Sequence, residues 1–213
     1  MILEPMTTIT DYILGAMAIV LGRRLWRLGQ SGGQASVKFW AASFLVTAVA
    51  AIAGGTSHGF ADVLGTTGHA VLWKLTVWSI GFTAFFLLLA TAHAALIGRA
   101  RQALIVAAGL QLVVYFVWMI SHDEFTWVIA GYLPAVVVVL VLQSRELRRG
   151  TAGAGWLVLG IATTLVGAGV QASGFALHQH FNHNDLYHVI QMGATVMLYR
   201  GAALARDRDP NSP

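Results

Sequence analysis

Long apolar stretches dominate this chain, and short polar stretches separate them. Runs of about 20 apolar residues recur, which is the length that crosses a hydrocarbon core of about 30 Å as an α-helix. The pattern predicts seven such helices, at roughly residues 9–26, 38–60, 69–97, 102–121, 125–143, 154–177 and 184–204. All connections but one are short. We therefore expect one compact domain over residues 1–205, followed by a disordered cytoplasmic tail over residues 206–213.

The composition supports a membrane protein. Of the 213 residues, 57% are hydrophobic and only 10% are charged, whereas about a quarter of a soluble domain is charged. Lipid is therefore expected to surround most of the surface. The chain contains no cysteine, which excludes disulfides, thiolate catalysis and zinc–thiolate sites. The net charge of +4 comes from short basic clusters beside the apolar runs, so a nucleic-acid partner is not expected.

The charged residues predict an orientation. Positive residues gather on the cytoplasmic side of membrane proteins, and here they occupy alternate connections and the tail: Arg23, Arg24, Arg27, Lys38, Arg99, Arg101, Arg145, Arg148, Arg149, Arg206 and Arg208. The sequence thus predicts an all-α integral membrane protein, a seven-transmembrane helix bundle with its N-terminus outside and its C-terminus inside. We expect it to be a multi-pass protein of the plasma (inner) membrane.

Histidines gather on the side predicted to face outward, where seven of the eight fall. His188 lies twelve residues before Arg200, about 18 Å along a helix, so it is expected within the hydrocarbon region. An ionisable group at that depth is a candidate functional residue because it is unfavourable without a partner. Asn184 and Asp185 lie one turn before His188 and could hold its second ring nitrogen, as partners of metal-ligating histidines do.

Imidazoles from several helices suit a zinc site that keeps one open position. The candidate ligands are His58, which ends the second predicted span, His188, and either His183 or His69. The alternative for each histidine is a structural role as a hydrogen-bonding residue near the membrane interface.

Two motifs carry a resemblance to a known group. The segments GGTSHGF, with Ser57 and His58, and NDLYHVIQ, with His188, resemble motifs of the CREST superfamily of seven-helix membrane metallohydrolases, which includes alkaline ceramidases and progestin and adipoQ receptors. The resemblance implies zinc held by three histidines and hydrolysis of an amide or ester bond in a lipid at the outer leaflet. It also implies that Ser57 or Thr56 donates to the developing oxyanion and that Asp185 or Asp62 acts as a ligand, orienting group or general base.

The chain departs from that pattern at three places. Asn184 stands where the family has the first histidine of the seventh helix, and Gly54 stands where it has a serine. The aspartate of the third helix is missing, with His69 near its place.

These residues lead us to expect a zinc-dependent enzyme acting on a membrane lipid, with the site on the extracytoplasmic side. The alternatives are a non-catalytic receptor or sensor that binds a ligand, with or without a structural metal, a membrane protein that binds haem, and a transporter. A retinal protein is not expected, since the seventh predicted span has no lysine. The sequence leaves the oligomeric state open, including a homo-oligomer.

Overall fold

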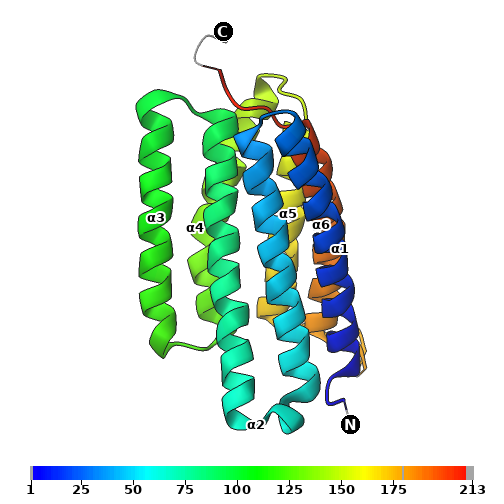
Figure 1. Cartoon of the computed structure of the whole chain (residues 1–213). Coiled ribbons are helices and arrows are strands. Elements are labelled where there is room, and N and C mark those ends of the chain that lie inside the picture. Colours follow the sequence, from blue (N-terminus) through cyan, green and yellow to red (C-terminus); the bar gives the residue numbers. More distant parts are fainter. Residues whose placement is uncertain (1, 179, 210–213) are drawn as a thin grey trace.

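The computed structural model describes residues 2–178 and 180–209, which form six α-helices and no strand (Figure 1). The helices are α1 (Pro5–Ser31), α2 (Ala35–Ala95), α3 (Gly98–Ser121), α4 (Phe125–Arg148), α5 (Ala154–Ser173) and α6 (His183–Leu204). The all-α prediction is therefore confirmed.

Helix α2 is made of two antiparallel arms. Its 61 residues leave helical geometry at Phe60 and Gly65, and the φ angle of +63° at Gly65 is one that glycine adopts without steric strain. Figure 1 shows the chain folding back at this turn, so that the arm before it and the arm after it run side by side. The second and third predicted spans correspond to these two arms.

Five of the six helices have the length and composition of membrane helices. Helices α1 to α5 are each long and apolar enough to cross a membrane, whereas α6 is not among them. The outer face of α3 carries a row of exposed apolar side chains, including Val106, Leu110, Val113, Val114 and Val117. Such a face is unusual in a water-soluble monomer and is compatible with a multi-pass membrane protein.

Five helices form a ring. Helix α1 packs against α2 and α6, α5 packs against α6 and α4, and α4 packs against α2. Helix α3 packs mainly on α2, outside the ring. Glycines permit the closest approach of α5 and α6. A Cβ atom on Gly160 would lie 2.7 Å from Leu198, and one on Gly201 would lie 2.5 Å from Leu157.

The two ends of the bundle differ. The start of α1, the turn of α2, the α3–α4 connection and residues 174–178 and 180–182 lie at one end, which we call the N-end (Figure 1). The C-terminal segment lies at the opposite end, the C-end, and it is attached there. Asp207 accepts hydrogen bonds from the amides of Ala35 and Ser36, at 2.8 and 2.7 Å, and Arg208 pairs with Glu146 at 2.8 Å.

The sequence placed Asp207 and Arg208 in a disordered tail, whereas the structure holds both against the C-end. Asp207 lies where its carboxylate caps the first amides of α2, which have no side-chain cap of their own. The last predicted tail residues, 210–213, lie outside the described residues.

Candidate functional site

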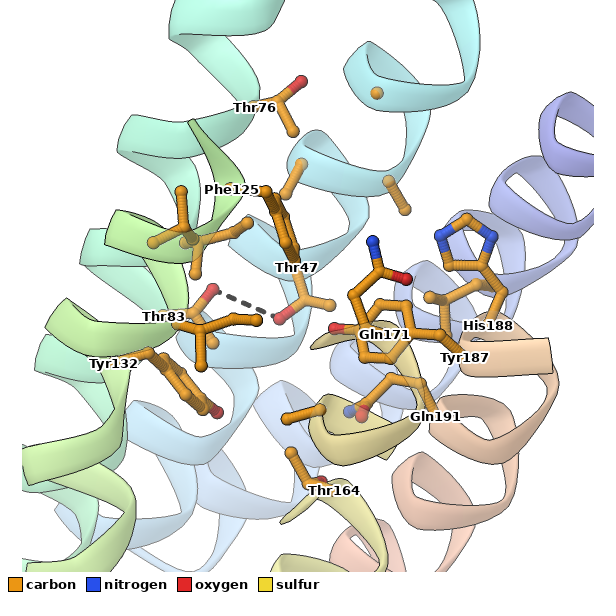
Figure 2. A pocket seen from close by; sticks show the side chains of 18 of the residues that line it. Thr47, Thr76, Thr83, Phe125, Tyr132, Thr164, Gln171, Tyr187, His188 and Gln191 are labelled. Atoms are coloured by element: carbon orange, nitrogen blue, oxygen red, sulfur yellow. Dashed lines mark hydrogen bonds between the residues drawn. The ribbon is translucent and has the colours of Figure 1, made fainter. Parts of the chain in front are cut away.

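A cavity of about 300 Å³ lies inside the ring of helices, in its N-end half (Figure 2). Residues of α1, α2, α4, α5 and α6 line it, and α3 contributes none. Most of its wall is apolar, with Leu14, Ala50, Ile80, Val128, Leu133 and Leu165 among the lining residues. A concave apolar space with a few polar groups is the usual form of a small-molecule site.

A buried aspartate–histidine pair forms part of the cavity wall. His188 on α6 is only 8% exposed, and its Nε2 lies 3.2 Å from Oδ1 of Asp11 on α1. Its Nδ1 lies 3.0 Å from the hydroxyl oxygen of Thr10. Both ring nitrogens of His188 are therefore held by α1, and the partner that makes the buried ionisable group tolerable is Asp11.

The sequence reasoning missed Asp11 as a site residue. The signal was nevertheless present, because Asp11 falls inside the first predicted span, 9–26, where a carboxylate needs a partner. The carboxylate of Asp11 in the first predicted span could have been paired with the imidazole of His188 in the last.

Asp185 does not lie at His188, where local spacing had suggested it. It is 1% exposed, and its carboxylate accepts hydrogen bonds from the Thr7 hydroxyl and the Asn182 amide, both at 2.8 Å. The Asn182 side chain in turn accepts from the Asp185 amide, which completes a capping box at the start of α6. Asp185 thus fixes the start of α6 and joins it to α1.

Ser57 and His58 are adjacent in sequence, but their side chains lie in different parts of the structure. Ser57 is buried and lies 2.9 Å from Nδ1 of His69, so the pair links the two arms of α2 outside the cavity lining. His58 lines the cavity; its Nδ1 lies 3.4 Å from a carboxylate oxygen of Glu4, and its ring meets the Trp73 ring edge-on at 5.9 Å.

The remaining predicted residues lie away from the cavity. His183 begins α6, and Asp62 is exposed beside the turn of α2; neither lines the cavity. Of the four predicted zinc ligands, the structure brings His58 and His188 to one cavity. In the described part of the chain, no three histidine, aspartate or glutamate side chains gather closely enough to hold a metal ion. Zinc stays a prediction.

Comparison with known proteins adds a family. Residues 6–207 match the model of a family of unknown function (DUF6962). The chain belongs to this family. The DUF6962 match runs from α1 to the segment after α6, so the cavity and its aspartate–histidine pair lie inside it. No curated protein and no solved structure shows a significant match.

Proposed function

We propose that this DUF6962 protein is a multi-pass membrane protein that binds an amphiphile, a molecule with a polar group and an apolar chain, in its cavity. The observation that carries the proposal is the cavity itself. Its apolar wall suits a hydrocarbon chain, and the Asp11 carboxylate beside His188 can accept a hydrogen bond from a polar group at the N-end.

The proposal includes seven spans, with the two arms of α2 as the second and third. The basic residues near the α1–α2, α2–α3 and α4–α5 connections all belong to the C-end, which supports a cytoplasmic C-end under the positive-inside rule. The cavity would then lie in the extracytoplasmic half of the bilayer, open to ligands from the outer leaflet.

Photolabelling of the purified protein with 1-decanol carrying a mid-chain diazirine tests the binding proposal. We expect peptide mapping to find the label on cavity residues. Ala168 lines the cavity, so Ala168→Phe should fill the space and abolish that labelling. Ala162 is exposed on the same helix, so Ala162→Phe is the matched control and should leave the labelling unchanged. Labelling that is confined to the outer surface, or that is insensitive to Ala168→Phe, would contradict the proposal.

A second candidate function adds chemistry at the same place: zinc-dependent hydrolysis of an amide or ester bond of the bound lipid. The separation of 3.2 Å between Asp11 Oδ1 and His188 Nε2 is a hydrogen-bond distance, and it is also compatible with two ligands of one zinc ion. Thr10 at Nδ1 of His188 would orient the ring, as such partners do in metal sites. His58 lines the same cavity, but in this structure it does not lie close enough to Asp11 and His188 to form a three-ligand set, so it would have to move toward them to serve as the third ligand.

In this candidate the protein groups have separate tasks. Asp11 and His188 would hold the zinc ion, and the apolar wall would hold the hydrocarbon chain of the lipid beside it. A bound zinc ion would lower the pKa of a ligated water and polarise the carbonyl.

Metal analysis of protein purified without chelators, together with assays of fatty-acid release from lipid amides and esters, tests this candidate. We expect stoichiometric zinc in the wild type and its loss in Asp11→Asn, His58→Gln and His188→Gln. His183→Gln is the control, since His183 lies outside the cavity lining. Metal-free wild-type protein would overturn the zinc candidate and leave the binding proposal standing.

A further inference from the structure

The deep part of the cavity contains polar groups without partners. The hydroxyls of Tyr132 and Tyr187 and the side-chain amide of Gln191 line it. Within the described residues none of these groups makes a hydrogen bond, and the Gln191 Oε1 atom is fully buried. Figure 2 shows the three side chains, from α4 and α6, pointing into the same space.

Unpaired polar groups in an apolar interior are unfavourable, and native structures keep few of them. The arrangement of Tyr132, Tyr187 and Gln191 suits a molecule that is bound in the cavity, displaces water and pairs with them. Each of the three groups can both donate and accept, so a hydroxyl or a carbonyl suits them.

The helix register gives the depth of this polar floor. On three helices, a polar floor residue lies seven positions from a residue at the N-end rim of the cavity: Tyr132 from Phe125, Thr164 from Gln171, and Gln191 from Asn184. Seven residues are two helical turns, or about 10 Å. On α4 and α5 the lining residues between rim and floor are apolar, with Val128, Ile129 and Leu165, whereas on α6 Tyr187 and His188 lie between them.

The rim and the floor of the cavity differ in their ionisable side chains. The carboxylate and imidazole side chains that line it, Asp11, His58 and His188, belong to the rim and the wall beside it. Among the described lining residues, the floor has hydroxyl and amide groups only. A neutral polar group is therefore the type that the floor would recognise.

We propose that the cavity floor is a second recognition site and that the ligand is polar at both ends of an apolar segment about 10 Å long. Three backbone bonds span at most about 3.6 Å in an extended chain, so this segment corresponds to about eight bonds. The inference rests on the proposed function, because it names the class of amphiphile that the cavity binds. A ligand with one headgroup and a plain chain would leave the polar floor unpaired.

Competition against the photoreactive 1-decanol tests this inference with neutral alcohols of one chain length. We expect 1,8-octanediol to displace the label from the cavity at a concentration roughly 10-fold lower than 1-octanol does, the effect of about one net hydrogen bond. The hydrophobic effect favours the mono-alcohol, so this order cannot arise from chain burial. A longer diol, 1,16-hexadecanediol, should lose the advantage because its second hydroxyl passes the floor.

Substitutions at the floor test which residues cause the preference for the diol. Gln191→Met and Tyr132→Phe should each reduce the preference for the diol while 1-octanol competes as before. Tyr199→Phe is the matched control, because Tyr199 lies on α6 but does not line the cavity.

Equal competition by 1-octanol and 1,8-octanediol in the wild type overturns the second site and leaves the binding proposal intact. A preference for the diol that persists in both floor variants also overturns the second site and leaves the binding proposal intact. Failure of every alcohol to displace the label would overturn the binding proposal as well. If a floor variant does not fold, the wild-type comparison still decides the inference.

Discussion

Replacement of Gly55 by alanine should push α1 away from α2 and displace Asp11. A Cβ atom on Gly55 would lie 2.7 Å from Cβ of Asp11 and 3.3 Å from the carbonyl oxygen of Thr8. Both atoms are attached directly to the backbone of α1, so the contact can be relieved only by moving the helix. Overpacking of this kind costs about 1–3 kcal/mol of unfolding free energy.

The adjacent Gly54 provides the control. A Cβ atom there would lie 3.4 Å from Thr76 and 3.7 Å from Oδ2 of Asp11, which are ordinary contacts. Both substitutions gain the same helix propensity over glycine, about 0.5–1 kcal/mol. The difference between Gly55→Ala and Gly54→Ala therefore isolates the close contact, and we expect about 1–3 kcal/mol in favour of Gly54→Ala.

Unfolding in mixed micelles by titration with a denaturing detergent measures this difference. Photolabelling of the cavity should decrease in Gly55→Ala and persist in Gly54→Ala, because only the former moves Asp11. Equal stabilities of the two variants would refute the reasoning, since they would mean that α1 and α2 do not approach each other at Gly55.

Two further predictions concern the carboxylates of Asp207, which is half-buried, and of Asp185, which is buried. Burial alone would raise the pKa of Asp207, but hydrogen bonds from Ser36 and Ala35 outweigh it and hold that pKa below its ordinary value. A lowered folded-state pKa contributes stability that is present above about pH 4 and lost as the pH falls below it. The unfolding free energy should thus decrease on acidification, and less steeply in Asp207→Asn; parallel pH profiles would contradict this role. Thr7→Val removes the hydroxyl that donates to the buried Asp185 carboxylate and should cost about 1–3 kcal/mol in the same unfolding assay, whereas an unchanged stability would show that the bond contributes nothing.

The helices were predictable from the sequence because each apolar run has to bury its backbone polar groups inside a helix when lipid surrounds it. The helix ends were less predictable. The first span was expected at 9–26, whereas α1 extends from Pro5 to Ser31. Apolar runs mark the part of a helix that lies in hydrocarbon, and the helix continues through polar residues until a signal such as Gly32–Gly33 ends it.

The candidate site was predictable only in part. His58 and His188 share the cavity, as their depth in the predicted spans suggested. The carboxylate at His188 was assigned by local spacing, which favoured Asp185 over a residue far away in the sequence. Asp185 follows Asn182 by three positions, however, and this spacing commits its carboxylate to a capping box. Because Asp185 is used in the capping box, the carboxylate that pairs with His188 comes from another helix.

The segment of α1 that faces α6 explains how that partner is positioned. Thr7 and Asp11 lie four residues apart on α1, and Asp185 and His188 lie three apart on α6, so each pair spans about one turn. The two helices run in the same direction from the N-end (Figure 1), so the Thr7–Asp185 bond sets the register in which Asp11 meets His188.

The same arrangement explains how the chain can have Asn184 where the resemblance expects a histidine. The side chain there accepts a hydrogen bond from Gln171 of α5 at 2.7 Å, so it ties α6 to α5 rather than acting beside His188. The second group at His188 comes instead from α1, through Asp11. If zinc binds, an aspartate from the first helix therefore takes the place that the resemblance assigns to a histidine on the seventh. Asp11→His would then be expected to retain zinc where Asp11→Asn loses it, and loss of zinc in both variants would contradict this exchange of ligands.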